Sequence, residues 1–395
     1  MHLVIVSPFP PSITGIGQYG YHVTRALVKS GSFERISVLA GSPVNGYMPN
    51  HLGNTEIDYC WQPGQWKART AILSRVKRLS PDLVWFNAGA SIFGRSPWVN
   101  VSGLLTPMFV QRLGYPTVVT LHELVELTDL RALGAPGGPF ARLGAKALTT
   151  IATQADILCL TMRHYADWLT AQKVDCAHIP IGAYHEPELL EESGTQELLF
   201  FTTLAPFKGL ELLLEAFQLL RVKYPKLKLT IAGAEHVRFP DYARALKSRF
   251  NGTDGVNWLG QTSEDAVREL FRRAFIVVLP YSASTGSSSV VYQAATWGRP
   301  IVTSNLSEIK ELILESNLQV ELFNSGDIQS LCESIRNLID SQAKRHDQTS
   351  HNFNAIQRTR PYETCQKYLQ AFNRALEKRH SPKRIEVQKT EYKPA

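Results

Sequence analysis

Short apolar runs alternate along the chain with longer segments in which apolar residues recur every three or four positions. A short continuous apolar run is typical of a strand buried on both faces, and the longer period is typical of an amphipathic helix. A first series of strands is expected at His2–Ser7, Ile36–Ala40, Ile57–Cys60, Leu83–Phe86, Pro116–Leu121, Asp156–Leu160 and His178–Ile181. A second series is expected at Glu197–Thr202, Lys226–Ala232, Val256–Leu259, Phe275–Leu279 and Pro300–Ser304.

The segments between these runs predict helices that cover the sheets. The first helix follows a glycine loop and ends at Gly31, since glycine readily takes the left-handed conformation of a helix end. Ser263 and Ser307 are expected to cap later helices through their hydroxyl groups. The inner face predicted for the first helix consists of Tyr21, Ala26, Leu27 and Val28, and that of the helix after Glu197–Thr202 of Leu210, Leu213, Leu214, Phe217 and Leu220.

A polar stretch without periodicity, residues 184–196, separates the two series and indicates a linker. Two consecutive strand-and-helix series predict an α/β protein with two doubly wound, Rossmann-like domains that face each other across a cleft. The expected domains are 1–183 and 197–360. A last helix is expected at 361–379, and residues 380–395 are expected to form an unstructured tail.

Composition and charge narrow the class of protein. The chain has 395 residues, 44% of them hydrophobic, and a net charge of +7. No run of five basic residues occurs, so nucleic acid is not an expected partner. Five scattered cysteines without a CxxC pair argue against a disulfide framework and against zinc, and favour a reducing cytoplasm. The N-terminus starts directly with a strand and no apolar run reaches the length of a membrane span, which predicts neither export nor insertion.

A basic amphipathic helix is predicted at Lys67–Ser80, and an apolar, aromatic segment follows at 92–113. A solvated helix face and internal packing are the default interpretations of these two segments. Together with the net charge they also permit peripheral contact with the cytoplasmic face of a membrane.

The stretch 279–302, LPYSASTGSSSVVYQAATWGRPIV, is the first candidate binding site. A buried strand ends at Pro280, a loop of small residues follows, and a helix begins near Ser288 and ends at Gly298. Free backbone N–H groups and the positive end of a helix dipole then lie at the carboxyl edge of a sheet, where a phosphate-bearing ligand would bind. The alternative is an ordinary strand-to-helix turn.

Two further candidates lie in the first series. Gly15-Ile16-Gly17 follows the first strand, but the full GxGxxG spacing and the acidic residue of a dinucleotide site are missing. His122 and Glu123 follow the strand that ends at Leu121, at the carboxyl edge where ligands bind in open α/β sheets. The alternative for His122 is a structural histidine bonded to neighbouring backbone.

With these motifs together, the chain resembles the GT-B glycosyltransferases, specifically the retaining glycosyltransferase family four, also described as glycosyl transferases group 1. The resemblance covers nearly all of residues 1–379 and rests on PPSITGIGQY, on LAPFKG and on PYSASTGSSSVVYQAATWGRPIV. It implies that a nucleotide-sugar binds mainly to the C-terminal domain and the acceptor mainly to the N-terminal domain. It also implies that the C-terminal helix packs back on the N-terminal domain.

The resemblance further assigns roles to single residues. Lys208 of LAPFKG matches the family's contact to the donor diphosphate; the alternative is a surface lysine. Gly15 and Gly17 match the glycine loop that approaches the donor phosphates. His122 matches a histidine near the transferred sugar.

The remaining assignments lie in the C-terminal domain. Glu308 resembles the family's helix-start glutamate, with Glu311 as a competitor. The N–H groups around Gly286 to Ser288, Ser287 included, are expected to hold the diphosphate.

Three positions depart from the family pattern. Thr285 and Gln293 stand where the family has two glutamates, the first near the sugar and the second on the ribose. Gln293 keeps one acceptor oxygen, whereas Thr285 has no carboxylate. Thr203 stands in place of an arginine that often partners the lysine. These changes leave the donor and the activity open.

The expected function is a metal-independent, retaining transfer of a hexose from a nucleoside diphosphate sugar to a hydroxyl acceptor, which can be a glycan, lipid-linked or small. No cofactor beyond the nucleotide-sugar is expected, and no metal-ligand spacing is found in the sequence. Two alternatives stay open: a degenerate GT-B module that binds nucleotide or glycan without transfer, and a nucleotide-sugar epimerase. The family's chemistry assigns His122, Lys208 and Thr285 as the catalytic candidates.

Overall fold

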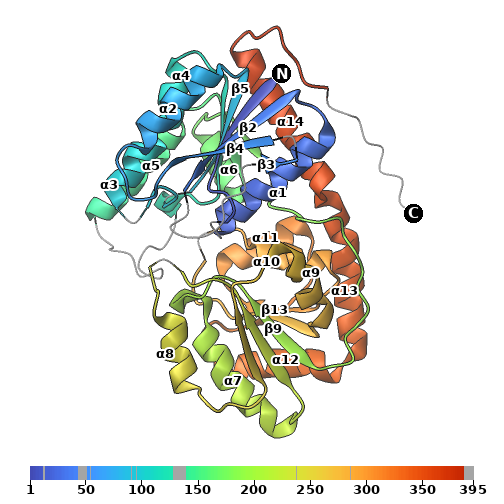
Figure 1. Cartoon of the computed structure of the whole chain (residues 1–395). Helices are drawn as coiled ribbons and strands as arrows, with labels where there is room; N and C mark the ends of the chain where they lie inside the picture. The colour runs from blue at the N-terminus through green and yellow to red at the C-terminus, as the bar shows by residue number, and fades with distance from the viewer. Residues whose placement is uncertain are drawn as a thin grey trace. The chain divides into compact units, whose positions relative to one another are not determined.

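The structure, a computed structural model, describes residues 1–11, 14–42, 51–53, 55–89, 91–94, 96–127, 139–236, 238–284 and 286–386. It divides into two compact units (Figure 1). Unit 1 contains the described residues of Met1–Thr128, Pro136–Ile181 and Pro361–Ala395, and unit 2 contains Gly182–Arg360. Each unit has its own sheet and its own apolar core.

Unit 1 is built on a sheet in which the described strands lie in the order β3-β4-β2-β1-β5-β6-β7-β8. All neighbours are parallel except β3, which pairs antiparallel with β4. Strands covered by helices on both faces need apolar residues at every position, and Leu3, Val4 and Ile5 of β1 are accordingly fully buried. The strands are β1 His2–Val6, β2 Arg35–Gly41, β3 His51–Leu52, β4 Thr55–Trp61, β5 Leu83–Ala88, β6 Thr117–Leu121, β7 Ile157–Leu160 and β8 Cys176–His178.

Helix α1, Gly15–Ser30, begins at a side-chain cap and ends at a glycine. The Thr14 hydroxyl accepts a hydrogen bond from the Gly17 N–H, and Gly31 ends the helix at φ 64°, as predicted. The predicted inner face was wrong except for Leu27. The residues that pack inward include Tyr19 and Val23, which with Leu27 follow a spacing of four that keeps them on one side of a helix.

The other helices of unit 1 lie in the connections between strands. Helix α2 confirms the predicted amphipathic segment, with Ile72 and Val76 buried and Lys77 and Arg78 exposed. No helix in the described ranges is both long enough and apolar enough to cross a membrane. The helices are α2 Ala68–Leu79, α3 Pro97–Leu104, α4 Thr106–Arg112, η1 Val125–Leu127, α5 Pro139–Ala152 and α6 Arg163–Ala171.

The last helix, α14 Pro361–Lys378, belongs to unit 1, as predicted (Figure 1). The Tyr368 hydroxyl lies 2.7 Å from the Tyr19 hydroxyl and 2.8 Å from the Thr120 hydroxyl. Thr120 also accepts a hydrogen bond from the Trp85 indole N–H at 2.9 Å. A buried chain of hydroxyl groups therefore joins α14 to α1, β5 and β6.

Replacing Tyr368 with phenylalanine is expected to lower the free energy of unfolding by about 1–2 kcal/mol. The ring stays in the core, but the hydroxyl groups of Tyr19 and Thr120 each lose a buried partner. Urea denaturation of the full chain measures this loss. Tyr21→Phe is the matched control because the ring of Tyr21 packs on Phe9 while no described residue bonds its hydroxyl. An equal loss of unfolding free energy in both variants would contradict a stabilising role for the chain of hydroxyl groups.

Unit 2 repeats this architecture with a fully parallel sheet in the order β11-β10-β9-β12-β13-β14. All five residues of the predicted inner face of α7 are buried, because apolar residues at spacings of three and four share one face. The strands are β9 Glu197–Phe201, β10 Lys228–Ala232, β11 Val256–Gly260, β12 Ile276–Leu279, β13 Ile301–Ser304 and β14 Glu321–Phe323. The helices are η2 Pro206–Lys208, α7 Leu210–Lys223, α8 Tyr242–Arg249, α9 Glu264–Arg273, α10 Ser289–Thr296, α11 Ser307–Ser316, α12 Ile328–Asp340, α13 Gln342–Ile356 and η3 Gln357–Thr359.

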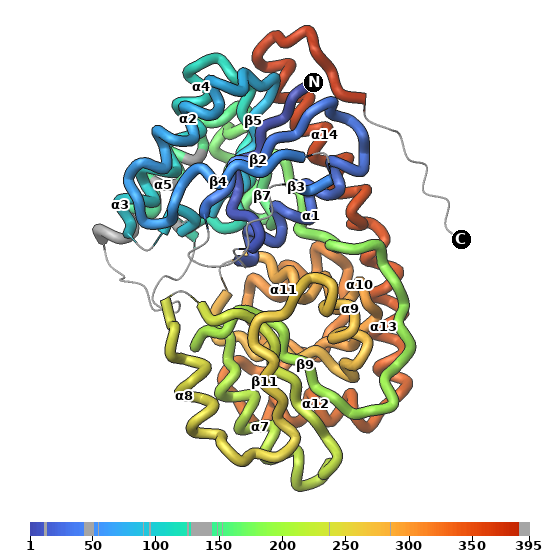
Figure 2. The backbone as a smooth tube through the Cα atoms, in the orientation of Figure 1, coloured from blue at the N-terminus to red at the C-terminus, as the bar shows by residue number. Residues whose placement is uncertain are grey.

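Some sequence predictions for local structure were wrong. Strand β8 lies at Cys176–His178 rather than at 178–181. Ser307 is the first residue of α11 and Leu306 is its cap, and the Ser307 hydroxyl bonds the neighbouring Glu308 carboxylate at 3.0 Å. Ser263 does occupy the cap position of α9, but its side chain makes no cap hydrogen bond. The backbone trace in Figure 2 also shows α8, α12 and α13, which the sequence analysis left unassigned.

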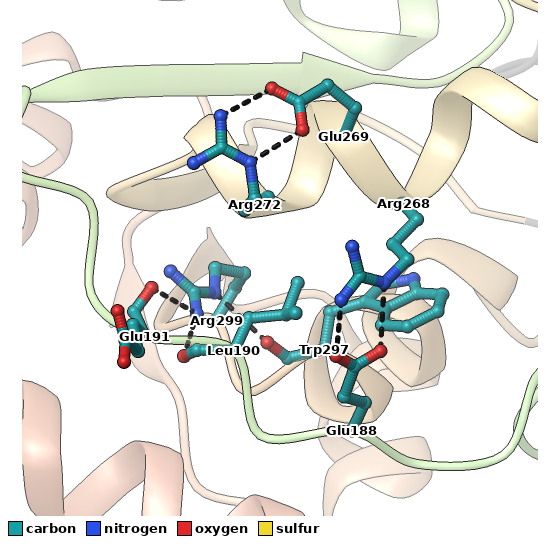
Figure 3. Close-up of polar contacts among 8 residues, drawn as sticks. All are labelled: Glu188, Leu190, Glu191, Arg268, Glu269, Arg272, Trp297 and Arg299. Carbon is teal, nitrogen blue, oxygen red and sulfur yellow. Dashed lines mark hydrogen bonds and ion pairs between the residues drawn. The ribbon is translucent and has the colours of Figure 1, made fainter.

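The predicted linker has no helix or strand, and it packs on unit 2 through buried charge (Figure 3). Arg299, 2% exposed, donates to the backbone carbonyls of Leu190 and Glu191 in this segment. It also donates to the carbonyls of Trp297 and Ala274. Burial lowers the pKa of Arg299 to about 10, so it stays charged at neutral pH and the carbonyl oxygens balance its charge.

Candidate functional site

Each sheet has a point at which the order of its strands reverses. In unit 1, β1 lies between β2 and β5; in unit 2, β9 lies between β10 and β12. Ligands of doubly wound folds bind at the carboxyl edge beside such a point, since the loops of the two central strands diverge there. The loops after β1 and β5 and those after β9 and β12 are therefore the expected binding loops.

In unit 2, the turn that carries Lys208 is bound directly to the loop after β12. The Phe207 carbonyl accepts hydrogen bonds from the N–H groups of Ser282 at 3.0 Å and Ala283 at 3.4 Å. Gly209 has φ 71°, and a Cβ atom there would lie 1.7 Å from the Pro280 carbonyl oxygen. Only glycine allows this approach, so Gly209 fixes where Lys208 sits.

The ammonium group of Lys208 lies 4.0 Å from the centre of the Tyr281 ring, an attractive cation–π contact. Within the described chain, Lys208 has no carboxylate partner. The Tyr281 hydroxyl is 3.3 Å from the hydroxyl of Ser288, the cap residue of α10. Helix α10 has no side-chain cap and no acidic residue in its first turn. A cation without a counter-ion and an uncapped helix start therefore flank one tyrosine, an arrangement suited to an anion.

The loop before α10 contains the other predicted diphosphate contacts. Gly286 is buried, and its carbonyl accepts a hydrogen bond from the Ser284 hydroxyl at 2.9 Å. Ser287 is partly exposed and Ser288 is buried. Gln293 lies one turn into α10 and is 7% exposed. Thr285 lies outside the described residues.

Two predicted donor residues share the carboxyl edge but make no described contact with the Lys208 cluster. Thr203 follows β9 and is partly exposed. Glu308 lies in the first turn of α11, after β13, with its carboxylate bonded to Ser307. Among the described residues, these two share with Lys208 only their position at the carboxyl edge of the same sheet.

Sequence analysis missed a small aromatic cluster beside Lys208. The rings of Phe207, His236 and Phe239 pack on one another with centroid distances of 5.5–6.1 Å. Burial lowers the pKa of His236, and the charges of Arg238 and Lys208 lower it further. His236 is therefore a neutral ring at pH 7. Its position shortly after the end of β10 was the sequence feature that could have identified it as a candidate site residue.

In unit 1, His122 is held by an asparagine that sequence analysis did not assign. The His122 Nε2 atom lies 2.7 Å from the Asn87 Oδ1 atom, and Asn87 is the last residue but one of β5. The Asn87 amide nitrogen donates to the Ser7 hydroxyl at 2.9 Å and to the Ile16 carbonyl at 2.7 Å. Because these bonds orient the amide, Oδ1 is an acceptor and His122 must carry its proton on Nε2. The Nδ1 lone pair then makes no hydrogen bond within the described chain.

The surroundings of His122 favour its neutral form. The Tyr19 ring meets the imidazole edge to face with centroids 4.8 Å apart. Burial lowers the pKa of His122 to about 4. In the unfolded chain the pKa of this histidine is near 6.5, so between pH 6.5 and 4 the unfolded state binds a proton that the folded state does not bind. The free energy of unfolding should therefore fall as the pH drops from 6.5 toward 4.

The predicted glycine loop of unit 1 was wrong, because Gly15 to Gly17 form the first turn of α1, next to this pair. Gly17 is buried in the first turn of α1, and Gly15 is exposed. A Cβ atom on Gly15 would meet nothing within 4 Å, so no described part of the protein requires glycine there. A Cβ atom on Gly20 would lie 2.3 Å from the Ser7 hydroxyl and 2.7 Å from the Asn87 amide nitrogen. Gly20, which the sequence analysis missed, allows α1 to pack on the Asn87 network.

The Asn87→Asp variant is expected to raise the pKa of His122 by about one unit or more. A carboxylate would accept the same Nε2–H bond and would also stabilise the imidazolium ion. NMR titration of the His122 ring measures the pKa, with His122→Gln to assign its signal. Asn100→Asp is the control because Asn100 is also buried in unit 1 but bonds only backbone groups. An unchanged pKa in Asn87→Asp would show that Asn87 does not hold the imidazole.

Known proteins resemble this chain in sequence and in fold. Residues 195–341 match the family described as glycosyl transferases group 1. The chain is 22% identical over 380 residues to a glycogen synthase of Mycobacterium tuberculosis, with 87% of each chain covered. It is 26% identical over 234 residues to a D-inositol 3-phosphate glycosyltransferase of Mycolicibacterium vanbaalenii, covering 52% of this chain and 50% of the relative.

Solved structures show the same fold. Sucrose-phosphate synthase from Thermosynechococcus elongatus superposes with a TM-score of 0.73 at 14% identity, covering 96% of this chain and all of that one. HepE of Anabaena, in complex with UDP-glucose, gives a TM-score of 0.68 at 16% identity, covering 94% and 98%. These structures show that the fold is GT-B, and the family match and the relatives in sequence make the chain a glycosyltransferase of the GT-B type. The match of residues 195–341 to the glycosyl transferases group 1 agrees with the resemblance found in the sequence.

Proposed function

We propose that the chain transfers a hexose from a nucleoside diphosphate sugar to a hydroxyl acceptor with retention of configuration. The observation that supports this most is the Lys208 ammonium group, which has no described carboxylate partner and lies beside the uncapped start of α10. A diphosphate would supply the missing negative charge. We further propose that the reaction needs neither a metal ion nor another cofactor.

Charge stabilisation and positioning would supply most of the barrier reduction. When the bond between the anomeric carbon and the diphosphate oxygen breaks, negative charge develops on that oxygen. Lys208 and the N–H groups from Gly286 to Ser288 would stabilise this charge without reorganising. Thr203 and Glu308 at the donor edge, and Gly15 and Gly17 in the first turn of α1, would take the roles that the resemblance implies for them.

His122 would act through its Nδ1 lone pair. A neutral imidazole with a bonded Nε2–H can accept a hydrogen bond from a sugar hydroxyl but cannot donate one at Nδ1. We therefore propose that His122 orients a sugar hydroxyl group or the reacting centre. Gln293 would bind the ribose through its amide, with less strength than a carboxylate would provide.

Release of nucleoside diphosphate from a panel of donors tests the proposal. UDP-glucose is the first donor to use, since HepE was solved in complex with it. The expected result is acceptor-dependent release, and NMR of the product should show that the anomeric configuration of the donor is retained. An inverted product would contradict the retaining reaction, and a requirement for added divalent ions would contradict metal independence.

The absence of both signature glutamates supports a second candidate. Gln293 occupies one of those positions and Thr285 the other. A module without transfer would bind nucleotide or glycan and leave the donor intact. Calorimetry with UDP and GDP, followed by a donor hydrolysis assay, separates the two: binding without sugar cleavage would favour the module.

A further inference from the structure

Positive charge is concentrated in one stretch of unit 1. Residues 59–122 contain seven Lys or Arg residues and one acidic residue, Asp82, a net charge of +6 in a chain whose total is +7. Asp82 is bonded to Lys383 at 2.8 Å. Two of the seven cations, Arg75 and Arg78, pair with Asp58, which lies just before the stretch. This segment includes helices α2, α3 and α4, which contact one another and lie together on one side of the unit 1 sheet (Figure 1).

Several cations of these helices are not balanced by the protein. Lys67, Lys77 and Arg112 are exposed and form no ion pair with a described residue. Arg69 of α2 lies over the Phe109 ring of α4, 5.1 Å from its centroid, and so adds charge above an apolar ring. The surface therefore presents a field that attracts polyanions.

Two exposed tryptophans lie at the starts of helices α2 and α3. Trp66, in the turn before α2, is 61% exposed, and Trp98, in the first turn of α3, is 71% exposed. The turns that carry them touch: the Gly64 N–H donates to the Phe93 carbonyl at 2.6 Å, and a Cβ atom on Gly94 would lie 2.5 Å from the Gly64 nitrogen. Apolar surface of an indole ring that stays in contact with water raises the free energy of the protein, and a partner that covers the ring lowers it.

We propose that the surface formed by Trp66, Lys67, Arg69, Lys77, Trp98 and Arg112, the tryptophan-basic surface, docks on a bilayer that contains anionic lipid. Indole rings prefer the boundary between lipid headgroups and hydrocarbon, and cations beside them bind anionic headgroups. A nucleic-acid site would need a basic groove that follows a backbone, whereas these cations lie spread over α2 and α4.

The surface adjoins the candidate site of unit 1. The turns with Trp66 and Trp98 follow β4 and β5, and His122 follows β6, so all three lie at the carboxyl edge of one sheet. A bilayer on this surface would bring lipid-linked hydroxyl groups close to His122. Docking itself does not depend on the proposed transfer reaction, and it is measured without turnover.

Sedimentation of the full chain with vesicles tests the proposal. We expect binding to vesicles of phosphatidylcholine with phosphatidylglycerol, weak binding to phosphatidylcholine alone, and loss of binding at high salt. The double variant Lys67→Gln, Lys77→Gln is expected to weaken binding by at least about tenfold, since each lysine near an anionic surface contributes about fivefold. Trp66→Ser with Trp98→Ser is expected to weaken it about tenfold through the lost apolar contact.

Matched controls come from unit 2. Lys226 and Lys228 are exposed and outside the proposed surface, so the double change to glutamine removes the same charge. Leu314, 83% exposed, gives the apolar control Leu314→Ser. The proposal is overturned if the chain does not bind anionic vesicles, or if the control variants weaken binding as much as the surface variants. It is also overturned if the tryptophan variant binds vesicles normally but no longer uses a soluble glycan acceptor, because the indoles would then serve glycan binding.

Discussion

Replacing Lys208 with alanine lowers donor turnover by about 100- to 1,000-fold while the protein stays folded, if Lys208 stabilises the departing diphosphate. The size follows from the loss of one preorganised charge at the atom where negative charge develops. Little stability should be lost, because Lys208 is partly exposed and its contacts are cation–π contacts with Phe207 and Tyr281. The measurement is kcat and KM for nucleoside diphosphate release, beside the thermal midpoint.

Two further variants make this result specific. Lys208→Arg keeps the charge and should recover part of the lost rate, although the planar guanidinium group places that charge differently. Lys226→Ala removes an exposed lysine before β10, at the amino edge of the same sheet, and should leave the rate unchanged. Equal turnover in Lys208→Ala and in the unmodified protein would exclude Lys208 from the reaction.

Gly209→Ala is the second large effect that we expect. The new Cβ atom would lie 1.7 Å from the Pro280 carbonyl oxygen, and the backbone of Gly209 has the left-handed φ of 71°. The turn and the loop after β12 must separate, at a cost of about 3 kcal/mol or more in the free energy of unfolding. Donor affinity should fall at least about tenfold, because the same separation moves Lys208 away from Tyr281.

Urea denaturation and calorimetry with nucleoside diphosphate measure the two losses. Gly144→Ala in α5 is the control, since a Cβ atom there meets nothing within 4 Å and alanine favours a helix. That variant should keep or slightly raise stability. If Gly209→Ala were as stable as this control, the close approach to Pro280 would not exist in solution.

Local patterns allowed the elements with a clear period to be predicted. The inner face of α7, the glycine end of α1 at Gly31 and the bounds of α14 depend on neighbouring residues alone. Helix α1 shows the limit of such patterns. The side of α1 that faces inward depends on the sheet on which it packs, and the local sequence does not show this. The sequence therefore predicted Tyr21 on the inner face, whereas Tyr19 packs inward.

The candidate site was predictable in part. Lys208 and His122 were found because each lies in a turn after a strand, and the structure places both at carboxyl edges. Lys208 follows β9, at the reversal point of its sheet, whereas His122 follows β6, the strand next to β5. Tyr281 and Asn87 were missed because their roles come from contacts across the sheet, at residues far away in sequence. No local pattern records that Asn87 bonds His122, since 35 positions separate them.

The hydroxyl chain through Tyr368 has a consequence for the order in which the protein can be made. The strands of unit 1 precede unit 2 in the chain and leave the ribosome before it, yet the helix that covers Tyr19 and Trp85 follows unit 2. Unit 2, continuous from Gly182 to Arg360, is synthesised completely before that helix. The middle of the chain can therefore finish folding first, whereas the N-terminal sheet keeps an uncovered face until α14 has emerged.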